Sequence, residues 1–373
     1  MNRQIGATFI VAGTTIGAGM LAMPLTAAPL GFLGSIFALF LLWGLMYTSA
    51  LMMVKCSLKT SPGQSIAWIA GDIFGAPYKH LLTGILILFL NALLAAYMEG
   101  GSSLLAIQLP HVSQDFLRIG FLAVFGLPLV LGTHWLDRKN RILFMGMMII
   151  FAIMVWLLIP NVSLSHLDIK PAQTFSTWSL VLPVFFTSFG FHASIPSLIH
   201  YCGNDESKLK SIMLWGSLLP CVIYFLWLLV TEGVLPLSGP QSFSSLPNED
   251  VGIFMAFLGG ITKSPMIALL SSLFAFLAIA TSFLGVGMGL FDLILERLPL
   301  PRLIVAVLTF SPAYFIGALF PEGFIEILKY AAIFLSILAV ITPALILLKL
   351  KEGSPLLSFG MLIFGLIIIV LGV

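Results

Sequence analysis

Long apolar stretches alternate with short polar connections along almost the whole chain. A membrane-spanning helix needs about 20 largely apolar residues, and eleven stretches come close to this length or exceed it. They cover residues 5–28, 31–55, 80–109, 119–135, 142–159, 178–201, 212–230, 265–295, 303–320, 324–348 and 356–373. The pattern predicts an all-α integral membrane protein with about eleven transmembrane helices.

Two connections are long enough to hold structure of their own. Residues 56–79 mix aromatic and aliphatic side chains with Gly and Pro, which favours a short amphipathic helix at the membrane interface. Residues 231–263 contain three prolines and then an apolar piece, 251–258, that is too short to span. We expect this second piece to form an outer lid. Neither connection resembles a flexible linker, so residues 1–373 are expected to form a single transporter domain.

Composition agrees with a membrane protein and excludes several other classes. The chain is 60% hydrophobic and 9% charged, whereas roughly a quarter of an average soluble domain is charged. A net charge of +2 gives no reason to expect a nucleic-acid partner. The three cysteines and six histidines are scattered, without metal-ligand spacing or an HExxH motif. We therefore expect neither an enzyme nor a cofactor, and no obligatory protein partner is evident.

The positive charges indicate how the chain is oriented. With a cytoplasmic N-terminus, thirteen of the 17 Lys and Arg residues fall on the inner side, and four fall on the outer side. The inner set is Arg3, Lys55, Lys59, Lys79, Arg138, Lys139, Arg141, Lys208, Lys210, Arg297, Arg302, Lys349 and Lys351, and the outer set is Arg118, Lys170, Lys263 and Lys329. This bias follows the positive-inside rule. An odd number of spans then places the C-terminus outside, in the periplasm of a bacterial cell.

Two of the predicted spans carry polar, glycine-containing interruptions of the same layout. The first reads GTTIGAGMLAMP from Gly13 to Pro24, and the second reads TSFGFHASIP from Thr187 to Pro196. A threonine precedes a proline by nine positions in both, and the offset from Thr15 to Thr187 is 172 residues. Irregular backbone is tolerated at membrane depth only where it is buried in protein or lines a cavity. The pattern favours a transporter of two related halves, each with a broken helix at the substrate site.

A broken helix exposes N–H groups at the start of its second half and carbonyls at the end of its first half. The helix dipoles add partial positive and negative charge there, which suits a zwitterion. We expect a carboxylate at the amides of Gly17, Ala18 and Gly19, and an ammonium at carbonyls around Thr14, Phe186 and Thr187. The alternative is that the glycines only allow close helix packing. The matching second interruption favours the ligand site.

Several side chains within the spans have two interpretations. Glu99 is expected either to carry a coupling proton or to be a neutral acid that hydrogen-bonds to a neighbouring helix. His192 is a candidate for proton transfer or for a packing role. Asn91 could bind a substrate hydroxyl or bridge two helices. Thr281 and Ser282 could help to hold a monovalent cation, or bond back to their own helix.

Phenylalanine is frequent around the second interruption, at Phe185, Phe186, Phe189 and Phe191. Large rings suit a pocket for an apolar or aromatic side chain. Ordinary packing is the alternative for each of them, because the chain has 31 phenylalanines.

Three long strings carry a resemblance to a known family. FIVAGTTIGAGMLAMPL near the start, FFTSFGFHASIPS in the sixth span and ATSFLGVGMGLFD in the eighth resemble the bacterial aromatic amino acid permeases, the hydroxy and aromatic amino acid permease family. Within that family the similarity is greatest to members specific for tyrosine. The resemblance implies proton-driven uptake of tyrosine or a related amino acid. It also implies the leucine-transporter fold, with two inverted five-helix repeats, residues 4–160 and 175–350, and a final helix at 355–373.

The resemblance also implies which positions bind the substrate and the coupling ion. Substrate contacts are implied at Thr14, Gly17, Ala18, Gly19, Asn91, Ala95, Phe186, Thr187, Ser188 and Phe191. In sodium-coupled members of the wider fold, a cation lies at the positions of Gly13, Ile16, Thr281 and Ser282. This chain keeps both hydroxyls, so sodium coupling stays open beside proton coupling through Glu99 or His192. A carrier of tryptophan or of another amino acid is the other alternative.

Overall fold

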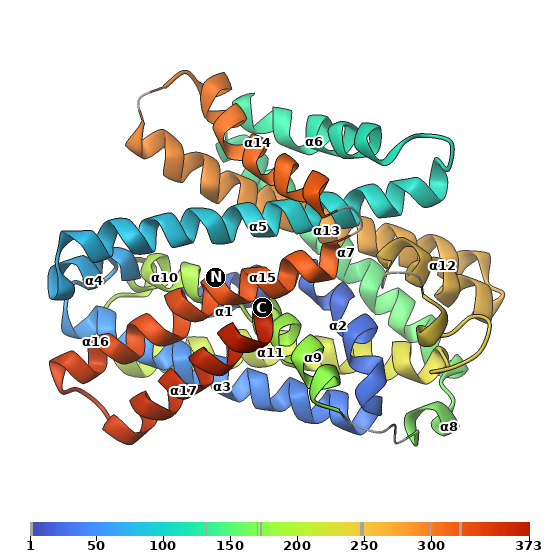
Figure 1. Cartoon of the computed structure of the whole chain (residues 1–373), viewed down its shortest axis with the longest axis horizontal. Coiled ribbons are helices and arrows are strands. Elements are labelled where there is room, and N and C mark those ends of the chain that lie inside the picture. Colours follow the sequence, from blue (N-terminus) through green and yellow to red (C-terminus); the bar gives the residue numbers. More distant parts are fainter. Residues whose placement is uncertain are drawn as a thin grey trace.

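The computed structural model describes residues 3–131, 133–169, 171, 174–246, 250–298, 300–320 and 323–373, without the side chains of 131 and 133–138. Lys170 and the side chain of Arg138, both used above to orient the chain, therefore lie outside the described residues. Everything with regular structure in the described part is helical, as predicted (Figure 1). The longer helices run roughly parallel or antiparallel to one axis of the molecule (Figure 1).

The helices follow the predicted spans closely. The first half of the chain forms α1 (Arg3–Thr15), α2 (Gly19–Ala27), η1 (Ala28–Leu30), α3 (Gly31–Lys59), α4 (Ile66–Phe74), α5 (Ala76–Gln108), α6 (Gln114–Leu131), α7 (Thr133–Leu158), η2 (Ile159–Asn161) and α8 (Leu164–Leu167). The second half forms α9 (Phe175–Ser188), η3 (His192–Ser194), α10 (Ile195–Cys202), α11 (Glu206–Val234), η4 (Phe243–Ser245), α12 (Val251–Thr262), α13 (Pro265–Arg297), α14 (Arg302–Leu319), α15 (Phe324–Leu335), α16 (Thr342–Leu350) and α17 (Pro355–Gly372).

Nine helical segments in the described part are long and apolar enough to cross a membrane. The predicted span 5–28 is divided between α1, with only 13 residues, and α2, which leads through η1 directly into α3. The predicted span 119–135 overlaps α6, which has 18 residues and begins five positions earlier than expected. These observations make the chain a multi-pass membrane protein.

Capping residues explain where several helices begin. Asp205 accepts a hydrogen bond from the Lys208 backbone N–H at the start of α11, and Asp250 and Ser264 do the same for α12 and α13. A side-chain oxygen at this position satisfies one of the N–H groups that a helix leaves unpaired. A hydrogen bond from the Lys208 backbone N–H, and a smaller effect of a hydrogen bond from the Lys208 side chain, lower the pKa of Asp205.

The bundle has two ends, which we name after short helices. The α4 end contains α4, the end of α3, the start of α5 and the turn between α16 and α17 (Figure 1). In this turn, Glu352 pairs with Lys59 at 2.9 Å and with Lys55 at 3.2 Å, and these hydrogen bonds lower the pKa of Glu352. The α8 end contains α8, α12 and the end of α11, where the Gly233 carbonyl accepts from the Ser163 N–H at 2.8 Å.

Each of the two long connections contains a short helix. Residues 66–74 form α4, which confirms the helix predicted within 56–79, and Ser65 caps it. Residues 251–262 form α12, whose 12 residues confirm that this apolar piece is too short to span. The two short helices lie at opposite ends of the bundle (Figure 1).

Helices far apart in the sequence pack against each other in pairs. Helix α3 lies along α11, α5 lies along α13, and α6 lies along α14. The halves of the broken spans pair crosswise, because α1 packs on α10 while α2 packs on α9. Crosswise pairing is the arrangement of two broken helices that run antiparallel.

One span contains an irregularity that the pattern did not predict. Residues Ser336–Ile341, between α15 and α16, are π-helical. The Ala339 carbonyl in this segment accepts a hydrogen bond from the Ser49 hydroxyl of α3. The Ser336 hydroxyl donates to the Gly365 carbonyl of α17 at 2.8 Å. Isolated π turns inside α-helices occur frequently at functional sites, so their surroundings are relevant here.

Candidate functional site

The first break is real and shorter than the sequence pattern suggested. Helix α1 ends at Thr15 and α2 begins at Gly19, so only residues 16–18 are non-helical. The Ala18 N–H donates to the Ser282 hydroxyl of α13 at 2.9 Å. A Cβ on Gly17 would collide with that same hydroxyl. Glycine at 17 is therefore required for the close approach of the break to α13.

The second break lies between Ser188, where α9 ends, and Ile195, where α10 begins. The Thr187 hydroxyl donates to the Pro183 carbonyl at 2.9 Å and lies 3.2 Å from the Leu328 carbonyl of α15. The Ser188 hydroxyl donates to the Val184 carbonyl of its own helix at 2.8 Å. Both predicted interruptions are thus confirmed as breaks in their helices.

The two breaks meet in the middle of the bundle. A Cβ on Gly19 would lie 2.7 Å from the Ser188 hydroxyl and 3.2 Å from the Ser188 Cα. The Tyr224 hydroxyl of α11 lies 2.7 Å from the Thr15 carbonyl and 3.0 Å from the Ser188 carbonyl. These carbonyls end the first half of each broken helix, so one buried phenol bridges the two breaks.

Tyr224 was not among the predicted site residues. Its only signal is a tyrosine far inside an apolar span, and no spacing rule relates it to residues around 15 and 188. In the described arrangement Tyr224 occupies carbonyls of the kind expected to receive an ammonium. Likewise, Ser282 occupies the Ala18 amide that was expected to receive a carboxylate.

Thr14 differs from the other residues predicted at the first break. Its side chain is exposed, and its hydroxyl donates to the Ile10 carbonyl of the same helix at 2.7 Å. Thr15 is buried and supplies the carbonyl that meets Tyr224. The structure therefore brings Gly17, Ala18 and Gly19 to the meeting point of the breaks, but not the side chain of Thr14.

The phenylalanines around the second break point in different directions. Phe186 packs edge-on against Phe364 of α17, with ring centroids 5.7 Å apart. Phe189 packs edge-on against Tyr224 at 5.3 Å, and Phe191 stacks on His192 at 4.9 Å. Phe189 therefore lies nearest the bridge between the breaks.

A cavity of about 100 Å³ adjoins the second break on the side of the α4 end. Gly190, His192 and Ala193 form its wall at the break, and Ser65 at the start of α4 contributes to the opposite part. Ser65 and Ala193 are exposed, so the cavity reaches the surface at the α4 end. The π-helical segment contributes Leu338 and Ala339.

Glu99 has a partner that neither of its predicted roles included. It is fully buried in α5 and forms a two-pronged ion pair with Arg118 of α6, at 2.5 Å and 2.9 Å. Arg118 also pairs with Asp115 at 2.6 Å. A Cβ on Gly317 would lie 2.5 Å from a Glu99 oxygen, so that glycine makes room for the carboxylate. Arg118 was placed above among the charges of the outer side. It is buried instead, because α6 begins at Gln114 and includes it.

The proposed cation ligands are close to the first break, but their hydroxyls are engaged. The Thr281 hydroxyl donates to the Leu277 carbonyl of its own helix at 2.8 Å, and Ser282 binds the Ala18 N–H. Asn140 of α7 donates to the Thr281 carbonyl at 3.2 Å. Gly13 faces the Phe144 ring of α7, with 3.8 Å between the ring and a Cβ at 13, and Ile16 is buried.

Asn91 and Ala95 lie in the buried middle of α5. The Asn91 amide donates to the Ile87 carbonyl of its own helix at 2.9 Å, and its Oδ1 has no hydrogen-bond partner. Phe89, two residues earlier, lines the cavity at the second break.

Comparison with known proteins decides the family. The model of the tryptophan/tyrosine permease family matches residues 1–373. The chain belongs to this family. The tyrosine-specific transport system 1 of Haemophilus influenzae is 38% identical, over 100% of this chain and 95% of that protein. The tryptophan-specific transport protein of the same organism is 32% identical, over 95% and 89%. The glutamine transporter 2 of Aliivibrio fischeri is 27% identical, over 99% of both.

Membership of the tryptophan/tyrosine permease family makes the chain an amino acid permease and not an enzyme. It confirms the resemblance inferred from the three sequence strings. The strings contain both breaks and the Thr281–Ser282 pair, so the residues that carried the resemblance surround the meeting point of the broken helices.

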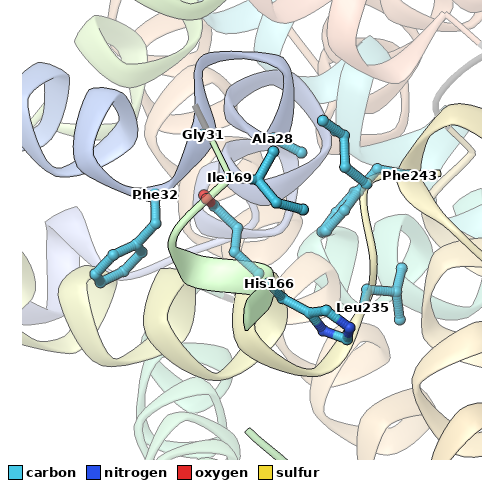
Figure 2. A pocket seen from close by; sticks show the side chains of 9 residues that line it. Ala28, Gly31, Phe32, His166, Ile169, Leu235 and Phe243 are labelled. Carbon is cyan, nitrogen blue, oxygen red and sulfur yellow. The ribbon is translucent and has the colours of Figure 1, made fainter. Parts of the chain in front are cut away.

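This permease has a second, smaller pocket at the α8 end that the sequence did not predict. About 20 Å³ of space lies between the Ala28–Gly31 corner and the elements that carry His166 and Leu235 (Figure 2). Glu232, in the last turn of α11, lines this pocket with 5% of its surface exposed, and its Oε1 has no hydrogen-bond partner. A water molecule is about the largest ligand that such a space accepts.

Proposed function

We propose that this permease is a symporter that imports tyrosine or a related aromatic amino acid across the bacterial inner membrane, coupled to the proton gradient, by alternating access. The observation that carries the proposal is the meeting of two broken helices at Gly19 and Ser188 in a chain whose relatives are named for tyrosine and tryptophan transport. Broken helices at mid-membrane are the usual binding sites of secondary transporters.

The packing supports two inverted five-helix repeats of the leucine-transporter kind. Corresponding helices lie side by side, and the broken spans pair crosswise. The short helices α4 and α12 follow corresponding spans yet lie at opposite ends (Figure 1), as an inversion requires. In this proposal residues 4–160 and 175–350 form the repeats of one domain, and α17 is the additional helix.

The orientation in the proposal follows the charge bias. The α4 end, with Lys55, Lys59 and Lys79, faces the cytoplasm, and the α8 end faces the periplasm. The N-terminus is then cytoplasmic and the C-terminus periplasmic. The cavity at the second break reaches the surface at the α4 end, so this arrangement suits release of substrate to the inside.

The proposed substrate site is built on both breaks. Its members are Thr14 through its carbonyl, Gly17, Ala18, Gly19, Asn91, Ala95, Phe186, Thr187, Ser188 and Phe191. A carboxylate at the Ala18 amide then requires Ser282 to release that N–H, which has a single proton to donate. The exchange of internal partners for substrate gives the protein two arrangements of similar energy, which alternating access needs.

Proton coupling is the proposal that the family resemblance implies, and sodium coupling is its alternative. The Thr281 hydroxyl donates its proton to Leu277 and the Ser282 hydroxyl accepts from the Ala18 N–H, so each oxygen keeps a lone pair for a cation at Gly13, Ile16, Thr281 and Ser282. Among the proton candidates, Glu99 is buried in a two-pronged ion pair with Arg118, whereas neither ring nitrogen of His192 has a hydrogen-bond partner and its side chain lines the cavity. His192 is the better candidate.

Counterflow and gradient-driven uptake in proteoliposomes test this proposal. Labelled tyrosine, tryptophan, phenylalanine and glutamine are offered under an imposed proton or sodium gradient. We expect tyrosine accumulation that an uncoupler abolishes and that external sodium does not affect. Accumulation that survives the uncoupler and requires sodium would reject proton coupling, and preference for tryptophan or glutamine would reject tyrosine as the main substrate.

A further inference from the structure

The cavity at the second break has walls that suit an aromatic ring. Thirteen described residues line it, and His192 and Ser65 are the polar side chains among them. Phe89, Leu86 and Leu338 are among the apolar remainder, from two different spans. Ser65 is exposed and already accepts the Trp68 N–H at the start of α4. The interior of the cavity is therefore apolar except at His192.

The imidazole of His192 lacks the partners that a buried polar group normally has. It is 2% exposed, and neither ring nitrogen has a hydrogen-bond partner. The Met46 backbone approaches it without hydrogen-bond geometry. A neutral imidazole has one donor and one acceptor nitrogen, and leaving either one unpaired in a protein interior is costly. A ligand with one polar atom at this point removes part of that cost.

The orientation of the imidazole is fixed by its neighbour. Phe191 stacks on it with ring centroids 4.9 Å apart and planes inclined by 25°. The stack holds the ring in one plane, and its nitrogens lie at the edge of that plane. A fixed imidazole edge is a directional hydrogen-bonding group, unlike a freely turning side chain.

The cavity is somewhat smaller than a known binding site for a single ring. An apolar cavity of about 150 Å³ in an engineered protein binds benzene, and the present cavity holds about 100 Å³. An outward movement of the flexible side chain of Met53, which lines the cavity, would supply the difference. Gly190, His192 and Ala193 of the second break line the cavity, two to five positions along the chain from Ser188.

We propose that this cavity binds the para-hydroxylated ring of tyrosine and that His192 hydrogen-bonds the ring hydroxyl. The proposal rests on the proposed function and adds a residue that determines specificity. Phenylalanine fills the same apolar space but leaves His192 without a partner, so it is discriminated against. Sites that hydrogen-bond a substrate hydroxyl reject the analogue that lacks it far more strongly than apolar pockets reject a change in size.

Two variants test the role of His192 in counterflow. His192→Leu keeps a similar volume without a polar atom, and His192→Gln keeps a donor and an acceptor. We expect the ratio of tyrosine to phenylalanine transport to fall at least tenfold in His192→Leu and to be largely kept in His192→Gln. His200→Leu is the matched control, because that histidine is exposed and does not line the cavity. Equal losses for both substrates in His192→Leu would overturn the proposal.

A competition series on the unmodified protein keeps the test independent of folding. Tyrosine and 4-aminophenylalanine carry a hydrogen-bonding group at the para position, whereas phenylalanine and 4-fluorophenylalanine do not. We expect the first pair to inhibit labelled tyrosine counterflow at concentrations at least tenfold lower than the second pair. Equal inhibition by 4-fluorophenylalanine would overturn the proposal. If no aromatic amino acid is exchanged at all, the proposed function fails instead, so the two failures are distinguishable.

Discussion

Replacing Gly17 with alanine should damage the meeting point of the breaks by a predictable amount. The new Cβ would lie less than 3.0 Å from the Ser282 hydroxyl oxygen, and Cβ atoms in proteins essentially never come that close to another atom. The hydroxyl can retreat only by abandoning its 2.9 Å bond to the Ala18 N–H. Overpacking costs about 1–3 kcal/mol, and an unsatisfied buried amide costs about the same. Either cost makes the described conformation, in which the two breaks meet, about 5- to 150-fold less populated relative to the other conformations of the protein.

The assay is tyrosine counterflow in proteoliposomes, normalised to folded protein measured by size-exclusion chromatography. Gly84→Ala is the matched control, because a Cβ at 84 meets no atom within 4 Å and should cost nothing. In a Ser282→Ala background, the nearest remaining atom is the Cβ of residue 282 at 3.6 Å, an ordinary contact. Gly17→Ala should therefore have little additional effect there. An equal loss in both backgrounds, or activity matching Gly84→Ala, would refute this reasoning.

Three further predictions follow from other contacts. Tyr224→Phe removes the donor shared by two break carbonyls, so the thermal midpoint in detergent should fall, at a cost of about 1–3 kcal/mol; an unchanged midpoint would contradict the bridging role. Glu99→Gln leaves Arg118 buried without its full charge partner, which should cost about 3–5 kcal/mol and lower the folded yield. Normal yield with loss of proton-driven uptake would instead make the carboxylate a coupling group. Ala193→Cys, combined with Cys202→Ser, should react with an impermeant maleimide in inside-out vesicles; reaction only in right-side-out vesicles would reverse the proposed orientation.

The breaks could be predicted because their cause is local. Thr15 and Gly17 weaken a helix by themselves, and the same layout recurs at Thr187. Pro24, by contrast, lies inside α2. The extent of each break could not be predicted in the same way. Helical hydrogen bonding resumes as soon as tertiary contacts allow it, so the first break is only residues 16–18.

Partners across helices were the part that sequence did not reveal. The pairing of Glu99 with Arg118 depends on where α6 begins and on how α6 packs against α5. The amphipathic sequence at the start of α6 determines neither. Tyr224 bridges residues separated from it by 209 and 36 positions. The direction of Phe186 toward α17 likewise follows from the last turn of α9. Such contacts are set by packing of whole helices and have no short-range signature.

The π-helical segment at Ser336–Ile341 gives one wall of the cavity a means of changing without unfolding. A π turn holds one residue more than the α-helix around it, and passing that surplus residue along the chain rotates the intervening side chains by about 100°. Such a shift would take Leu338 off the cavity wall and separate the Ala339 carbonyl from Ser49. Helices α15 and α16 would keep their own hydrogen bonds throughout. The surplus residue would thus act as a movable defect that widens or narrows the opening of the cavity at the α4 end while the surrounding helices stay intact.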